Sequence, residues 1–128
     1  MLRYMEYLKR ELDILIKHVD TSREVIQMHF GGGTPTFFSA RQLEEIIKMS
    51  KSHFKNFRRY AEISCEIDPR HIKEDQMKVM SEQGFNRVSF GIQDFNEKVQ
   101  VAVHRVQPYD VTKKAMDLAR KYNMVSVN

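Results

Sequence analysis

The spacing of hydrophobic residues in the first half of the chain predicts a helix, a strand, a second helix and a second strand. Residues 4–19 have the apolar spacing of one helical face, formed by Leu8, Leu12, Leu15, Ile16 and Val19. Residues 24–30 are partly β-branched and are followed by three glycines, which is typical of a strand that enters a flexible loop. Ser39 and Gln42 form a capping-box pattern, which predicts the start of the second helix. Residues 62–67 alternate polar and apolar positions up to an Asp-Pro pair, so they predict a strand that stops there.

The second half of the chain repeats this alternation. Residues 72–80 indicate a helix that Gly84 closes, because glycine is common just beyond a helix end. Residues 87–93 alternate again and predict a strand, and residues 99–103 predict a short helix. Asp110 can cap a last helix, whose apolar positions are Val111, Ala115, Leu118, Ala119 and Tyr122.

This order of elements predicts an α/β fold. Strands that alternate with helices at this spacing imply βα units and a parallel sheet. The chain opens with a helix, and residues 125–127 begin a further strand at its close. We therefore expect residues 1–128 to be a single incomplete domain, a fragment of a larger α/β barrel.

Composition narrows the classes of partner and compartment. The 128 residues are 41% hydrophobic and 30% charged, which predicts a packed core rather than disorder. The net charge of +4 comes from 21 Lys and Arg scattered among 17 Asp and Glu, so charge alone indicates neither nucleic acid nor a membrane. No signal peptide or membrane-spanning run is visible, and we expect a cytoplasmic protein. Cys65 is the only cysteine, which excludes an internal disulfide and a cluster built from this chain's own thiolates.

The glycine run at residues 31–33 is the first candidate for chemistry. Three consecutive glycines directly after a strand are costly unless the backbone turns sharply or approaches a ligand. The loop lacks the GxGxxG spacing and the Gly-Lys-Ser/Thr ending of phosphate-binding loops. From the glycines alone, a purely structural turn and a cradle for a small polar group are about equally supported.

Two polar side chains near predicted strand ends, and an arginine beyond the predicted short helix, are further candidates. Glu66 lies near the carboxyl end of its strand, where parallel barrels place ligands. Gln93 repeats this position on the next strand and shares a face with Ser89 and Gly91, whose small side chains would leave room for a ligand. Arg105 could bind a carboxylate through two hydrogen bonds, although an isolated arginine is more often a solvated surface group. Cys65, on the face toward the helices, is more typical of a small core residue than of a nucleophile.

Four collinear segments together resemble a known family. They are FGGGTPT at 30–36, EIDPR at 66–70, GFNRVSFGIQDF at 84–95 and HRVQP at 104–108. In order and spacing they are similar to the oxygen-independent coproporphyrinogen III oxidases, which are radical S-adenosylmethionine enzymes. The resemblance implies a partial (β/α)6 barrel and a [4Fe-4S] cluster held by three cysteines of a CxxxCxxC loop. That loop is not in this sequence, so the resemblance implies that it lies upstream of residue 1, that a further aspartate lies beyond residue 128, and that the chain alone is inactive.

The resemblance also assigns roles to the candidate residues. It implies that the backbone of Gly32 and Gly33, with Thr34 beside them, holds the amino group of S-adenosylmethionine. Glu66 and Gln93 correspond to residues that hydrogen-bond the ribose hydroxyls. Arg105 corresponds to the arginine that pairs with the methionine carboxylate.

The reaction implied by the resemblance is a radical decarboxylation. An electron donor reduces the cluster, S-adenosylmethionine is cleaved to methionine and a 5′-deoxyadenosyl radical, and the radical takes a hydrogen from a propionate of coproporphyrinogen III. Loss of carbon dioxide and one electron leaves a vinyl group, and two such events give protoporphyrinogen IX. The cofactors implied are therefore S-adenosylmethionine and the cluster, in a protein expected to be monomeric.

Two rival readings stay open at this point. The related radical haem chaperones share the barrel and the glycine loop, but they tend to have EANPG and QSF where this chain has EIDPR and QDF. From another class, the chain could be a short nucleotide-binding protein or a non-catalytic partner subunit, for which the missing cysteines are the one argument.

Overall fold

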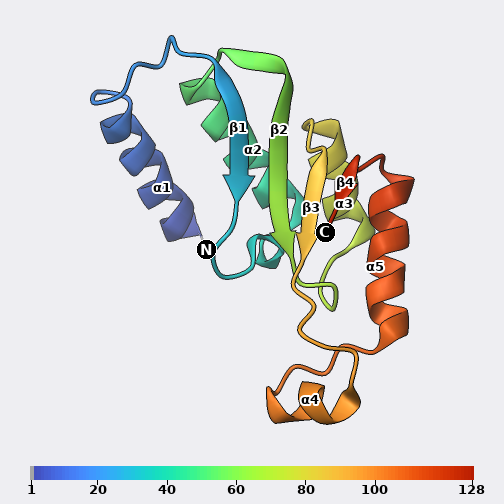
Figure 1. Ribbon diagram of the computed structural model, residues 1–128. Helices are drawn as coiled ribbons and strands as arrows, with labels where there is room; N and C mark the ends of the chain where they lie inside the picture. Colours follow the sequence, from blue (N-terminus) through green and yellow to red (C-terminus); the bar gives the residue numbers. More distant parts are fainter. Residues whose placement is uncertain (1) are drawn as a thin grey trace.

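The computed structural model describes residues 2–128 as a four-stranded sheet with helices packed on one side (Figure 1). In chain order the elements are α1 (Leu2–Leu15), β1 (Val25–Phe30), a 3-10 turn η1 (Pro35–Phe37), α2 (Ala40–His53), β2 (Phe57–Ile67), α3 (Glu74–Glu82), β3 (Arg87–Phe90), α4 (Glu97–Ala102), α5 (Tyr109–Lys121) and β4 (Ser126–Val127). The strands lie in the order β1-β2-β3-β4, and every neighbouring pair is parallel. The predicted α/β fold with a parallel sheet is therefore confirmed.

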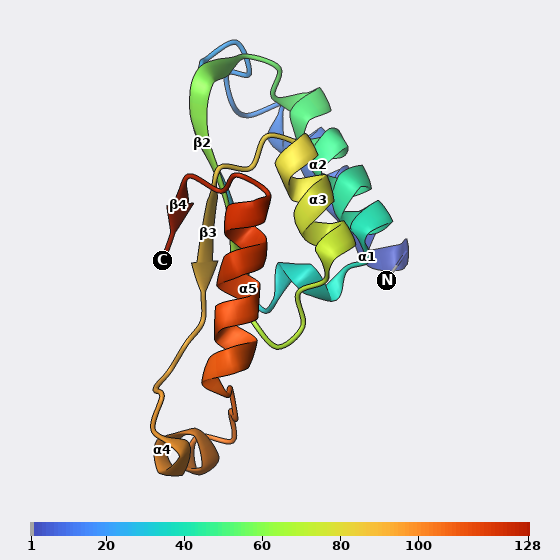
Figure 2. The ribbon, with the colours of Figure 1, turned by 90° about the vertical axis from the view of Figure 1, so that its right-hand side faces the viewer.

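The core lies between the sheet and its helices. Figure 2 shows α1, α2, α3 and α5 on one side of the sheet. On β2 the side chains of Ile63, Cys65 and Ile67 are at most 5% exposed and belong to the same cluster as the fully buried Met77 and Met80 of α3. Burial of apolar surface of this kind is the main favourable contribution to folding.

Several predicted element bounds differ from the structure. The first helix ends at Leu15 rather than at residue 19, and β2 begins at Phe57, five positions before the predicted start. The first residues of β2 show no alternation of polar and apolar side chains, because most of them are exposed. They still belong to the strand, since Phe57 pairs with Val25 of β1. The capping box of Ser39 and Gln42 is confirmed.

The predicted strand over residues 87–93 is shorter than expected. β3 ends at Phe90, because the N–H of Ile92 donates to the carbonyl of Phe90 at 2.9 Å and so closes a tight turn. Asp110 is not the cap of α5: the cap position belongs to Pro108, and Asp110 lies in the first turn.

Within residues 2–128 no helix combines the length and apolar character needed to cross a bilayer.

Candidate functional site

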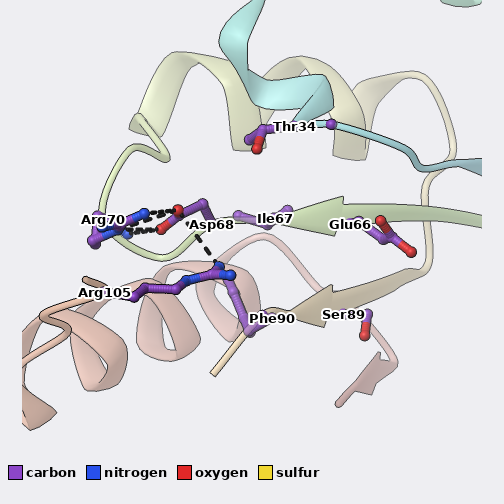
Figure 3. Close-up of a pocket in the computed structure, with 10 residues that line it drawn as sticks. Thr34, Glu66, Ile67, Asp68, Arg70, Ser89, Phe90 and Arg105 are labelled. Carbon is purple, nitrogen blue, oxygen red and sulfur yellow. Dashed lines mark hydrogen bonds and ion pairs between the residues drawn. The ribbon is translucent and has the colours of Figure 1, made fainter. Parts of the chain in front are cut away.

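A polar cavity of about 450 Å³ lies at the carboxyl ends of β2 and β3. Figure 3 shows the residues that line it, which come from the loop after β1, from the ends of the two strands, and from the segment after α4. They are Gly33, Thr34, Glu66, Ile67, Asp68, Arg70, Ser89, Phe90, Gly91 and Arg105. The carboxyl edge of a parallel sheet is where ligands bind in such folds. Four of the six predicted site residues, Gly33, Thr34, Glu66 and Arg105, are thus brought together.

The glycine loop turns sharply at its second and third residues. Gly32 and Gly33 have φ angles of +73° and +60°, a left-handed conformation that side chains disfavour. A Cβ at either position would meet no atom within 4 Å, so the space beside both residues is open. The Gly32 N–H points toward Glu66 and donates to its Oε2 at 3.4 Å. Gly32 does not line the cavity itself, but it connects the loop to the carboxylate that does.

Glu66 projects from the open face of β2 and is only loosely held. Its side chain is 52% exposed. Besides the long contact with Gly32, its Oε1 lies 3.5 Å from Nε2 of His29. The other ring nitrogen of His29 is 2.8 Å from Oγ of Ser64. Glu66 can therefore accept further hydrogen bonds from a ligand.

Asp68 is the buried anion of the site. Its side chain is 8% exposed and accepts hydrogen bonds from Nε of Arg70 at 3.0 Å and from Nη2 at 2.6 Å. Burial alone would raise the pKa of the Asp68 carboxyl, but the hydrogen bonds and charge of Arg70, with the charge of Arg105, outweigh it and lower the pKa to about 2. Asp68 is ionised at any physiological pH.

Arg105 lies across the end of β3. Its Nη2 is 3.6 Å from Oδ2 of Asp68, a longer contact than those of Arg70 (Figure 3). Its Nε is buried and has no hydrogen-bond partner among the described residues. The room that the sequence assigned to a ligand beside Gly91 is occupied by this guanidinium, because a Cβ on Gly91 would lie 2.7 Å from Nη2. Arg105 thus keeps unused donors inside the site.

Gln93 is not brought into the cavity. It lies three positions beyond the end of β3, is exposed, and is not among the lining residues. The tight turn at Ile92 takes the chain out of the sheet before Gln93 is reached.

Sequence reasoning missed Asp68 and Arg70 as site residues. Asp68 was interpreted only as part of an Asp-Pro strand stop, and Arg70 was not assigned a role. The signal was present, since an acidic residue directly after a buried parallel strand lies at the same edge as Glu66. The ion pair between the two residues could not be inferred from spacing.

The described residues do not form a metal site. Within residues 2–128 no three side chains of His, Cys, Asp or Glu gather closely enough to hold a metal ion. Cys65 is 1% exposed, and burial, with a smaller contribution from Glu66, raises the pKa of its thiol to about 12. The prediction that Cys65 is a core residue is confirmed.

Known proteins resemble this chain over nearly its whole length. The profile of the Radical SAM superfamily matches residues 2–128. An oxygen-independent coproporphyrinogen III oxidase of Helicobacter pylori is 50% identical over 127 residues, which are 99% of this chain and 28% of that protein. A solved structure of coproporphyrinogen III oxidase from Escherichia coli, described as a radical SAM enzyme, superposes with a TM-score of 0.89 at 36% identity and covers 98% of this chain and 29% of that one.

A more distant solved structure shares the fold. Native anSMEcpe with bound AdoMet superposes with a TM-score of 0.68 at 20% identity, over 96% of this chain and 33% of that one. The chain spans a little over a quarter of the length of the curated relatives it matches, and 28% of the Helicobacter pylori protein.

Proposed function

The chain belongs to the Radical SAM superfamily, and we propose that it forms the S-adenosylmethionine-binding part of an oxygen-independent coproporphyrinogen III oxidase. The observation that carries the proposal is the cavity at the carboxyl ends of β2 and β3, where the anionic Glu66 and the cationic Arg105 face one space beside the glycine loop. The 50% identity with the Helicobacter pylori oxidase supports the choice of reaction, and so favours the oxidase over a haem chaperone.

The residues present fit S-adenosylmethionine. This ligand carries an amino group and ribose hydroxyls, which need hydrogen-bond acceptors. It also carries a carboxylate, which needs a cation. The cavity volume of about 450 Å³ lies within the ~300–1,000 Å³ typical of small-molecule sites. The unpartnered Nε of Arg105 and the open space beside Gly33 are the two features that a ligand would use.

Each residue then has a binding role. Arg105 pairs with the methionine carboxylate through a charge-assisted hydrogen bond, and Glu66 accepts hydrogen bonds from the ribose. The backbone of Gly32 and Gly33, beside Thr34, receives the amino group. For Gln93, which is exposed and does not line the cavity, the ribose contact rests on the resemblance in sequence alone.

The residues present do not fit the [4Fe-4S] cluster. Such clusters are held by several thiolates, and the one cysteine of this chain is a buried thiol with a raised pKa. In the proposed enzyme the cluster ligands must therefore come from outside these 128 residues. If bound together in that enzyme, the cluster and the cofactor would supply one-electron chemistry.

The rest of the proposal concerns substrate, partners and compartment. The substrate is coproporphyrinogen III, two of whose propionates become vinyl groups, and a separate electron donor reduces the cluster. We propose a cytoplasmic monomer, and the free buried thiol of Cys65 suits a reducing compartment.

The proposed function can be tested with an anaerobic assay. The assay uses the complete enzyme of which, we propose, this chain is a part. With cluster, reductant and S-adenosylmethionine, we expect carbon dioxide release from coproporphyrinogen III and formation of protoporphyrinogen IX. Arg105→Ala should raise the KM for S-adenosylmethionine, whereas Arg120→Ala, whose side chain is 65% exposed on α5, should not. Binding of S-adenosylmethionine without turnover of coproporphyrinogen III would reject the substrate and leave the cofactor assignment.

A further inference from the structure

Gly91 leaves the space in which the Arg105 guanidinium lies. A Cβ built on Gly91 would be 2.7 Å from Nη2 of Arg105, 3.5 Å from Cζ and 3.7 Å from Nη1. Real Cβ atoms essentially never approach another heavy atom within 3.0 Å. The φ angle of Gly91 is not in the left-handed region, so its backbone does not require glycine. The requirement is for space alone.

The backbone around Arg105 is fixed by a buried pair of glutamines. The Arg105 N–H donates to the carbonyl of Gln100 at 2.8 Å. The side-chain amide of Gln100 donates to the carbonyl of Gln107 at 2.9 Å, and its oxygen accepts from the Gln107 N–H at 2.9 Å. Gln107, which is fully buried, in turn donates to the carbonyl of Gly91 at 3.0 Å. The segment carrying Arg105 is thus attached to the end of β3 at Gly91 itself.

The guanidinium is bounded on its other side by Asp68. The Arg105–Asp68 contact of 3.6 Å is an electrostatic attraction that does not fix the guanidinium in one position. The shorter hydrogen bonds of Asp68 are made with Arg70. Figure 3 shows Arg105 between Asp68 and the end of β3 at Phe90. The direction of the guanidinium therefore depends on the space that Gly91, which has no side chain, leaves for it.

We propose that Gly91 is a positioning residue that aims Arg105 at the carboxylate of S-adenosylmethionine. The proposal rests on the function proposed above for Arg105. A methyl group at residue 91 would lie only 2.7 Å from Nη2 and would displace the guanidinium from its line to the ligand. Because the conflict falls on the far end of a flexible side chain, the backbone need not move, and Gly91→Ala should fold.

Gly31 offers a matched control at the end of another strand. A Cβ there would lie 2.8 Å from Nε2 of His29 and 3.2 Å from Cδ of Glu66, so it would disturb the ribose side of the cavity. Gly31→Ala and Gly91→Ala add the same methyl group at two strand ends. Only the second touches Arg105.

The experiment measures equilibrium binding of S-adenosylmethionine and of decarboxylated S-adenosylmethionine to the complete, cluster-loaded enzyme. The ratio of the two dissociation constants reports recognition of the carboxylate. Arg105→Ala should weaken S-adenosylmethionine binding about 10- to 100-fold, as expected for a hydrogen bond between charged groups, and change the decarboxylated ligand little. Gly91→Ala should weaken S-adenosylmethionine binding by at least about tenfold. In the double variant with Arg105→Ala it should cause no further loss of affinity. Gly31→Ala should weaken both ligands by a similar factor and leave the ratio unchanged.

Three results would count against the proposal. Gly91→Ala with a native ratio, while Arg105→Ala loses it, would overturn the role of Gly91 and leave the proposed function standing. Arg105→Ala with a native ratio would overturn the carboxylate assignment in the proposed function, and the role of Gly91 with it. If Gly91→Ala fails to fold, its melting is measured again with Arg105→Ala: recovery supports the steric conflict, and failure in both backgrounds shows that Gly91 serves the backbone instead.

Discussion

The two faces of β2 differ in the side chains they present, which alternate along the strand between buried apolar and polar residues. Toward the helices lie Ile63, Cys65 and Ile67, all within the buried cluster. Toward the open face lie Glu62 and Glu66, each carrying a carboxylate. The helix face is tightly packed at these three positions, whose side chains are at most 5% exposed. The open face consists of polar groups that are satisfied to different degrees.

Glu62 and Glu66 show that difference most clearly. Glu62 accepts hydrogen bonds from Arg87 at 3.0 Å and from Gln27 at 2.9 Å, and these contacts, with Arg87 first, lower the pKa of its carboxyl. Glu66 has only contacts of 3.4 Å and 3.5 Å. A carboxylate that is already paired is structural, and one that is loosely held at the strand end can accept from a ligand. Position on a face is therefore not enough to identify a site residue; its state of pairing decides.

The largest expected effect is the loss of an apolar side chain from the helix face. Ile63→Ala should lower the free energy of unfolding by about 2–5 kcal/mol, because it removes buried surface and leaves a cavity. Ile26→Ala, at a residue that is 57% exposed on β1, is the matched control and should change stability by less than about 0.5 kcal/mol. Urea denaturation of both variants measures the difference. Equal losses would show that the helix face is not the stabilising one.

The second effect separates the two glutamates. Glu66→Ala should weaken S-adenosylmethionine binding by about one to two decades, since a hydrogen bond to a charged group contributes ~1.5–3 kcal/mol. Glu62→Ala removes the partner of Arg87 and can lower stability, but it should change the dissociation constant much less in the protein that remains folded. Equilibrium binding after a melting check makes the comparison. Near-native affinity in both variants would remove Glu66 from the ribose assignment.

The alternation of β2 was predictable, but the pairing on its open face was not. Residues 62–67 alternate strictly, so the sequence alone predicted which side chains face the helices. The end of β3 was predicted wrongly, because the turn at Ile92 depends on a backbone hydrogen bond that leaves no mark in the pattern. Likewise, Gly91 was predicted to leave room, and the structure shows that Arg105, fourteen positions later in the chain, takes it. Contacts between segments this far apart cannot be derived from periodicity.

The third effect is a pH dependence at the end of the strand. The pKa of Asp68 is about 2 in the folded protein, below its ordinary value of 3.8. A depressed folded-state pKa means that the stabilisation is present above about pH 4 and is lost as the pH falls toward about 2. Parent and Asp68→Asn should therefore differ in stability at pH 5, and the gap should narrow on acidification. Denaturation at pH 5, 4 and 3 tests this.

Asp117→Asn is the control for that pH series. Asp117 is 51% exposed and pairs with Lys113 within α5, away from the cavity. Its gap from the parent should be small at each pH, as is usual for an exposed ion pair. A gap for Asp68→Asn that stays constant from pH 5 to pH 3 would mean that the carboxylate charge does not contribute.

The smallest effect belongs to Cys65, which has a chemically reactive group on the face that carries no chemistry. Cys65→Ala should lower stability by about 1 kcal/mol, the scale for losing one buried methylene-sized group. It should leave S-adenosylmethionine binding and the iron content of the complete enzyme unchanged, because a thiol that is 1% exposed with a pKa of about 12 is neither a nucleophile nor a cluster ligand. In the parent, iodoacetamide should modify Cys65 only after denaturation, as mass spectrometry can follow. Rapid modification of the folded protein, or loss of iron from Cys65→Ala, would mean that the helix face of β2 opens, and the division between the two faces would not hold.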